Sequence, residues 1–146
     1  EVFDSTGVPI SFYRAQHRFG EQPYLTLKIG LEMNREKLFP CLEERVDRML
    51  EQGLLQEVER LMEMGYGPGL KPMQSLGYKQ MVQFLSREVG WDEAVRQMKK
   101  DTCHYAKRQW TWFKADPEIR WWNPSTDQEK IILEIKSFWG KGRGRA

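Results

Sequence analysis

The sequence predicts an α/β fold that is predominantly helical, with two strands at about residues 24–31 and 119–122 and four to five helices. Three observations carry this prediction. The segments YLTLKIGL and IRWW are rich in β-branched and aromatic residues, whereas the stretch between them repeats its apolar residues at helical spacing. Both strands are apolar enough for a parallel sheet that is covered on two faces, yet two isolated strands cannot form an independent sheet. The first residues, EVF, carry no residue that signals the start of a helix or strand, as if the chain began inside such an element. We therefore expect the C-terminal portion of a larger protein.

The central helices are expected from capping residues, glycine breaks and apolar spacing. Asn34 is a good N-cap for a helix that runs to Gln52, in which Pro40 indicates either a second helix start or a kink. Gly53 breaks this helix. The next helix is expected to end at Gly65.

The flanking segments carry other signals. Residues 1–23 are expected to be short and turn-rich. A loop over 65–75, rich in glycine and proline, leads into an amphipathic helix over 76–90. A long helix is expected over 91–115, where Asp-Pro stops it, and Ser125 is expected to cap the last helix.

The composition narrows the class of protein. The chain has 146 residues, enough for one domain, and its 23 basic and 21 acidic residues do not by themselves indicate a nucleic-acid partner. Two cysteines give no disulfide framework, and no apolar run approaches the roughly 18 residues of a membrane span. We expect a cytoplasmic monomer without a signal peptide or a membrane partner, in which residues 1–140 belong to one domain and residues 141–146 form a flexible basic tail.

The segment DTCHYAKRQWTWFKAD, residues 101–116, concentrates chemistry-bearing side chains. Its Cys103 and His104 are adjacent, and adjacent side chains on a helix point about 100° apart. They are therefore poorly placed to share one metal ion or to form a nucleophile pair. Neither kind of site is expected here.

Helical spacing divides this region into two stripes. One is expected to pack in the core: Val95, Met98, Thr102, Tyr105 or Ala106, Gln109 and Phe113. The other is basic: Arg96, Lys100, Cys103, Lys107, Trp110 and Lys114, with His104 and Arg108 on its edge. The basic stripe is either a solvated helix face or a ridge that contacts nucleic-acid phosphates. Trp110, Trp112 and Phe113 are expected mainly to pack in the core, with stacking on nucleic-acid bases as the alternative.

Three segments together resemble a known family. In order and spacing, IGLEMNREKLFPCLEERVDRMLEQGLLQEVERL, MQSLGYKQ and YAKRQWTWFKAD followed by IRWW are similar to the C-terminal half of the bacterial tRNA dimethylallyltransferases, or tRNA isopentenyltransferases. The resemblance covers residues 1 to about 122, and the combination of LGYKQ with AKRQxTW is its most specific part.

This resemblance implies a P-loop-like parallel sheet wrapped by helices, in an ATP-binding-like family. It also implies transfer of a dimethylallyl group from its diphosphate to N6 of the adenine 3′ of the anticodon, a base drawn out of the anticodon stem-loop, with Mg²⁺ assisting departure of the diphosphate. The family's phosphate-binding loop, its catalytic aspartate and most of its Mg²⁺ site belong to the N-terminal half. No G-x-x-x-x-G-K-[ST] motif occurs here, so this chain alone is expected to be inactive.

The resemblance also implies roles for individual residues. Arg45 falls on an arginine that helps to hold the diphosphate; its alternative is a surface arginine paired with neighbouring carboxylates. The predicted tRNA-binding residues are Lys71, Gln74, Lys100, Thr102, His104, Lys107 and Arg108. Cys41 and Cys103 depart from the family pattern, in which basic residues are common at both positions.

A second class of function remains open. The chain is either part of this RNA-modifying transferase or a stand-alone helical RNA-binding or adaptor module without catalysis. The two isolated strands favour the transferase, because a complete module should satisfy its own strand edges.

Overall fold

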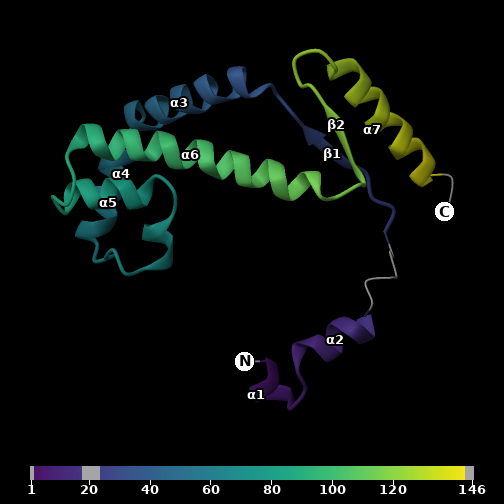
Figure 1. Ribbon diagram of the computed structural model, residues 1–146, viewed down its shortest axis with the longest axis horizontal. Coiled ribbons are helices and arrows are strands. Elements are labelled where there is room, and N and C mark those ends of the chain that lie inside the picture. Colours follow the sequence, from purple (N-terminus) through teal and green to yellow (C-terminus); the bar gives the residue numbers. More distant parts are fainter. Residues whose placement is uncertain (1, 18–23, 144–146) are drawn as a thin grey trace. The chain divides into compact units, whose positions relative to one another are not determined.

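The computed structural model describes the backbone of residues 2–17 and 24–143 and the side chains of residues 2–16 and 24–140 (Figure 1). The chain divides into two compact units, one formed by residues 29–128 and the other by residues 1–28 and 129–146. All of the residues with predicted binding roles lie in the unit 29–128.

A two-stranded sheet pairs β1 (Lys28–Leu31) with β2 (Ile119–Trp122), and the two strands run in the same direction (Figure 1). The predicted strand 119–122 is therefore confirmed, and so is the expected parallel sheet; of the two arrangements compatible with one such sheet, side by side or one strand apart, the structure shows the first. The first four residues of the predicted strand 24–31 are not strand, because β2 is only four residues long and offers them no partner. The Glu32 N–H donates to the Trp122 carbonyl at 2.9 Å just beyond the pairing.

Gly30 allows the two strands to approach closely. A Cβ atom at this position would lie 2.6 Å from Ile119 Cγ2 and 2.7 Å from Trp121 Cε3. Only a residue without a side chain fits against β2 here.

The helices of this unit follow the predicted order. They are α3 (Arg35–Glu51), α4 (Leu54–Glu63), α5 (Tyr78–Leu85) and α6 (Trp91–Lys114), with the 3₁₀ turn η1 (Lys71–Gln74) before α5. The Asn34 side chain accepts from Glu36 N–H at 3.1 Å, which confirms the predicted cap, and α3 continues through Pro40 without a second start. The helix expected over 76–90 is shorter, because α5 begins after Gly77 and ends before Ser86.

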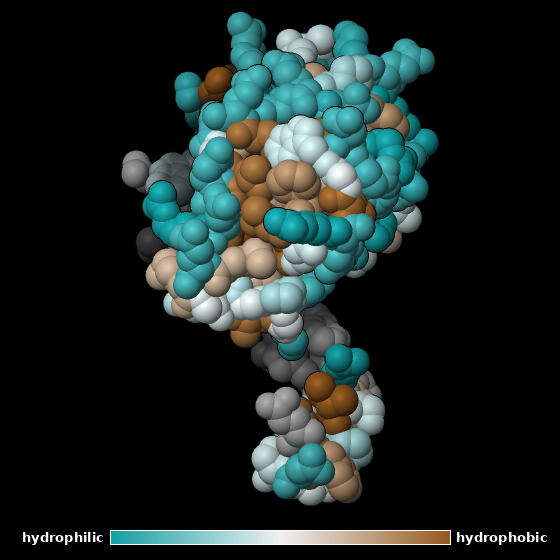
Figure 2. Space-filling view, turned by 90° about the vertical axis from the view of Figure 1, so that its left-hand side faces the viewer, coloured by the Kyte–Doolittle hydropathy of each residue, from teal (hydrophilic) through white to brown (hydrophobic). Residues whose placement is uncertain are grey.

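The core lies where α3, α4, α5 and the first half of α6 meet. Its buried apolar residues are Val46, Leu54, Val58, Met73, Met81, Val82, Ala94 and Met98. Figure 2 looks at this end of the unit and shows apolar side chains in the middle of the face, surrounded by hydrophilic ones.

The second half of α6 does not pack into the core. The expectation of a core stripe along the whole helix is therefore wrong for this half. Met98 is buried and Val95 and Thr102 are half-buried, but Tyr105 and Phe113 are exposed. Trp112 is 73% exposed, so the expectation that the aromatic residues here pack in the core is also wrong for this chain.

In the other unit the described residues form the helices α1 (Val2–Thr6), α2 (Ile10–His17) and α7 (Gln128–Arg143). The turn-rich N-terminal segment expected from the sequence is therefore mostly helical over residues 2–17, while residues 18–23 lie outside the described part. Ser125 does not cap the last helix, because a turn in which Asn123 N–H donates to Asp127 Oδ2 at 3.1 Å delays its start. The expected basic tail is helical up to Arg143, and residues 144–146 lie outside the described part.

Candidate nucleic-acid interface

One side of α6 presents cations to solvent. Lys100, His104, Lys107 and Arg108 are all exposed, and their spacing of three to four residues puts them on one face, which we call the outer face of α6. Within residues 29–128 the structure shows no ion pair for Lys100, Lys107 or Arg108. These cations are therefore available to an anion from outside the chain.

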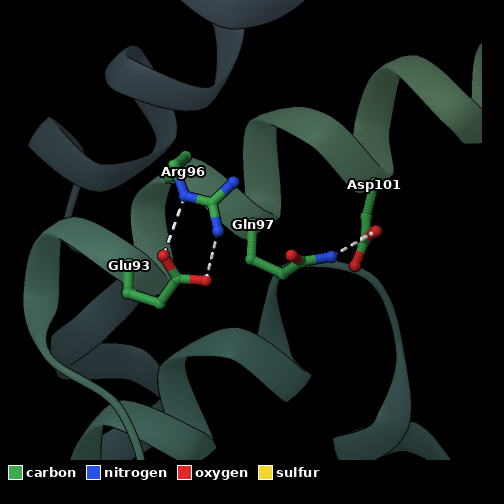
Figure 3. A network of polar contacts seen from close by, with 4 residues as sticks. All are labelled: Glu93, Arg96, Gln97 and Asp101. Carbon is green, nitrogen blue, oxygen red and sulfur yellow. Dashed lines mark hydrogen bonds and ion pairs between the residues drawn. The ribbon is translucent and has the colours of Figure 1, made fainter.

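The other cations of the helix are already paired. Arg96 Nη2 lies 2.5 Å from Glu93 Oε1, and its Nε donates to the second carboxylate oxygen at 2.8 Å (Figure 3). Lys99 Nζ lies 2.7 Å from an oxygen of Asp47 on α3. Arg96 and Lys99 thus form ion pairs within the protein, whereas Lys100, Lys107 and Arg108 on the outer face show none in this unit.

Part of the predicted basic stripe turns toward α3 and the sheet. The Arg35 guanidinium lies 5.3 Å from the ring centre of Trp110, and Lys114 Nζ lies 4.8 Å from the same ring and 3.2 Å from Glu32. Burial raises the pKa of the half-buried Cys103 thiol, and Glu43 acts in the same direction. The stripe therefore combines residues that point only to solvent with residues that also contact Arg35 and Glu32.

A groove of about 360 Å³ follows the carboxyl ends of β1 and β2. It is lined by Glu32, Met33, Asn34, Arg35, Leu38, Phe39, Ala106, Lys107, Trp110 and Asn123. Lys107 Nζ lies 5.1 Å from the ring centre of Phe39, so this lysine stands at the border between the groove and the outer face. Ligands of open α/β sheets commonly bind at this edge.

A second hollow lies on the opposite border of the outer face. This α5–α6 cleft has a volume of about 260 Å³ and is lined by Gln74, Leu76, Lys79, Gln80, Asp101, His104, Tyr105 and Arg108. It brings together three of the predicted tRNA-binding residues, Gln74, His104 and Arg108. Gln74 lies 30 positions before His104 in the sequence. Lys79 and Tyr105 were not predicted as site residues. Lys79 belongs to the LGYKQ motif, and this motif is the sequence feature that could have marked it as a site residue.

A chain of hydrogen bonds forms one wall of this cleft. Gln80 is only 1% exposed, and its Oε1 accepts from Gly77 N–H at 2.9 Å while its Nε2 donates to Asp101 Oδ2 at 2.8 Å. The other oxygen of Asp101 accepts from Gln97 Nε2 at 2.8 Å (Figure 3). Gly77 starts α5 with φ +94°, a conformation that favours glycine. The glycine and the buried glutamine of LGYKQ thus fix the start of α5 against α6.

The remaining predicted tRNA-binding residues differ in accessibility. Lys71 and Gln74 are exposed on η1, where the Gln74 amide donates to the Pro68 carbonyl. Thr102 is half-buried, and its hydroxyl donates to the Met98 carbonyl at 2.7 Å. Two positions separate Thr102 from both Lys100 and His104, so it does not share the outer face with them.

Arg45 is exposed on α3. Its neighbour Asp47 is paired with Lys99, and in the part of the chain with described side chains Arg45 has no ion pair. Its permanent charge is therefore not neutralised within this unit.

The side chains that the structure describes do not fit a metal site. Among them, no group of three histidine, cysteine or acidic side chains is arranged to hold a metal ion. No helix in the described ranges is long and apolar enough to cross a membrane.

Comparison with known sequences gives a consistent match. The family model for IPP transferase matches residues 1–116. The tRNA dimethylallyltransferase 2 of Syntrophus aciditrophicus is 54% identical over 129 residues, which cover 88% of this chain and 42% of that protein. The tRNA dimethylallyltransferase of Syntrophobacter fumaroxidans is 54% identical over 135 residues, covering 92% of this chain and 39% of that protein.

Two solved structures share the fold. A tRNA delta(2)-isopentenylpyrophosphate transferase from Staphylococcus epidermidis superimposes with a TM-score of 0.76 at 35% identity, covering 95% of this chain and 46% of that one. The full-length tRNA isopentenylpyrophosphate transferase from Bacillus halodurans superimposes with a TM-score of 0.74 at 31% identity. The match covers 94% of this chain and 48% of that one. This chain thus spans less than half the length of these relatives.

Proposed function

The chain belongs to the IPP transferase family, and on this premise we propose that it is part of a tRNA dimethylallyltransferase. The proposed reaction moves the dimethylallyl group of dimethylallyl diphosphate to N6 of the adenine 3′ of the anticodon. The observation that carries the proposal is the family match over residues 1–116, which include the outer face of α6 and the α5–α6 cleft. A monomer that acts in the cytoplasm is part of this proposal.

The proposed contribution of this chain to RNA binding is the outer face of α6 together with η1. Lys100, Lys107 and Arg108 are exposed cations for which the described unit shows no ion pair, and cations of this kind neutralise RNA phosphates. His104 and Gln74 can add hydrogen bonds from the cleft between them. Thr102 remains a prediction that rests on the resemblance alone, because its hydroxyl is directed to the Met98 carbonyl.

Arg45 is proposed to bind the diphosphate of the donor substrate. A planar guanidinium can hold two phosphate oxygens at once, and this one has no competing ion pair in the described unit. No catalytic base and no metal-dependent step is assigned to the residues of this chain.

The activity is tested with a chimera in which this chain replaces the matching C-terminal segment of the Syntrophus aciditrophicus relative. Transfer of radiolabelled dimethylallyl to an anticodon stem-loop is expected for the chimera and not for the 146-residue chain alone, which has no phosphate-binding loop motif. A chimera that folds cooperatively, binds the stem-loop and transfers nothing would favour the RNA-binding module without catalysis.

The role of Arg45 is tested in the same chimera. Arg45→Ala should raise the KM for dimethylallyl diphosphate by about tenfold or more, since a charge-assisted hydrogen bond contributes about 1.5–3 kcal/mol. The affinity for the stem-loop should stay unchanged. Equal losses for both substrates, or none, would return Arg45 to the role of a surface arginine.

The RNA-binding face is tested by salt titration. In the chimera, Lys100→Ala, Lys107→Ala and Arg108→Ala should each weaken stem-loop binding and lower the slope of log affinity against log salt by about 0.7 to 0.9. Arg60→Ala on α4 removes one exposed cation that is not on the outer face and serves as the matched control. If the three variants behave like the control, the outer face is only solvated.

A further inference from the structure

The α5–α6 cleft contains an acidic side chain among its basic ones. Asp101 lines the cleft together with Lys79, His104 and Arg108, yet in the part with described side chains it forms no ion pair. Its two oxygens accept from the amides of Gln80 and Gln97 instead, each at 2.8 Å. The Asp101 carboxyl group is thus held at this wall by uncharged amide donors and not by a cation.

A carboxylate on a surface that meets RNA is unfavourable unless it receives hydrogen bonds. It repels phosphates, and the neighbouring cations offset this only in part. Each carboxylate oxygen can accept two hydrogen bonds, so both oxygens of Asp101 keep one free position after the two amides. Among the RNA donors that can fill such a position are the exocyclic amino groups of adenine, cytosine and guanine, which only a base can supply.

The other walls of the cleft suit a flat ring. Tyr105 is 49% exposed, and the Arg108 guanidinium lies 6.0 Å from the centre of its ring. Aromatic faces and arginine planes are the surfaces on which unpaired RNA bases stack. The volume of about 260 Å³ lies just below the range of about 300–1,000 Å³ usual for pockets that bind whole small molecules, which favours a single base.

We propose that the α5–α6 cleft binds one unpaired nucleobase that carries an exocyclic amino group, with Asp101 accepting from this group and Tyr105 providing a stacking surface. This inference rests on the proposed binding of tRNA. Gln80 and Gln97 act as positioning residues, because their amides hold the carboxylate in one orientation. The outer face then binds phosphates of any sequence, whereas the cleft selects a base.

The test measures the anisotropy of labelled anticodon stem-loops that bind to the chimera. In each RNA one unpaired base loses only its amino group: purine replaces adenine, inosine replaces guanine, or 2-pyrimidinone replaces cytosine. One such replacement should weaken binding by about tenfold. In Asp101→Ala the same replacement should make less than a twofold difference. Asp92→Ala, which removes an exposed carboxylate from the first turn of the same helix, should keep the full tenfold discrimination.

The outcomes are distinguishable. If Asp101 only links α5 to α6, Asp101→Ala lowers the melting temperature but leaves the discrimination at tenfold, and the inference is overturned. Binding that depends on Lys100 and Arg108 but on no amino group also overturns it and leaves the proposed function intact. A folded chimera that binds no stem-loop overturns both.

Discussion

The two ends of the unit 29–128 differ in how their helices are covered. At one end α4, α5 and the first half of α6 bury one another, and Val58, Met81 and Met98 are at most 1% exposed. At the other end the second half of α6 and the short sheet leave Trp110, Trp112 and Phe113 exposed. The same helix thus passes from a core into solvent without a break. Helix formation depends on local signals, but burial depends on which partners the chain itself provides.

The largest effect should come from a truncation at the packed end. Met98→Ala should lower the free energy of unfolding by about 2–5 kcal/mol, because it removes a fully buried side chain and leaves a cavity against its neighbours. Urea unfolding followed by circular dichroism measures the change. A loss below about 1 kcal/mol would mean that this end is not a specific core.

A smaller effect is expected at the contact between α4 and α5, where the Tyr78 hydroxyl donates to Glu57. Tyr78→Phe should cost about 1 kcal/mol at pH 8, the usual net contribution of one hydrogen bond. This bond raises the pKa of Tyr78 above its ordinary value of 10.0. The stabilisation is therefore complete below pH 10 and is lost as the pH rises through the higher pKa of the folded state. Unfolding at pH 8 and pH 11 should show a smaller difference between the two proteins at pH 11; a constant difference would contradict the contact.

The smallest effect on stability should come from the open end. Trp112→Ala should change the free energy of unfolding of this chain by no more than about 0.5 kcal/mol, because the side chain is 73% exposed. The same urea titration measures it. A loss similar to that of Met98→Ala would show that the second half of α6 is covered in solution and would remove the contrast between the two ends.

Local signals explain which parts of the fold the sequence predicted. The Asn34 cap, the glycine at the end of α3 and the stop after α6 need only neighbours in sequence, and all are present. The exposed Trp112 and Phe113 could not be predicted in this way, since aromatic residues at helical spacing look the same whether or not a partner covers them. The helices of residues 2–17 were missed because Gly7 and the serines and threonines there also signal turns.

The residues on the outer face of α6 could be predicted from the sequence, but their arrangement with residues of other elements could not. Lys100, His104, Lys107 and Arg108 share one face by spacing alone, and spacing also places Thr102 away from them. The meeting of Gln74 and Lys79 with Tyr105 and Asp101 depends on how η1 and α5 pack against α6. That packing is fixed by Gln80, a buried polar residue whose partners are separated from it in sequence by up to 21 positions. No local pattern reports such a bond.

The close approach at Gly30 has a consequence for how this protein can evolve. A Cβ atom at position 30 would lie 2.6 Å from the Ile119 side chain and 2.7 Å from the Trp121 side chain. A single substitution of Gly30 would therefore cause a steric clash. A substitution there becomes tolerable only on a background in which Ile119 and Trp121 have already become smaller. In a saturation mutagenesis library, Gly30 should therefore show strong epistasis with positions 119 and 121, and homologous sequences should change at these positions jointly or not at all.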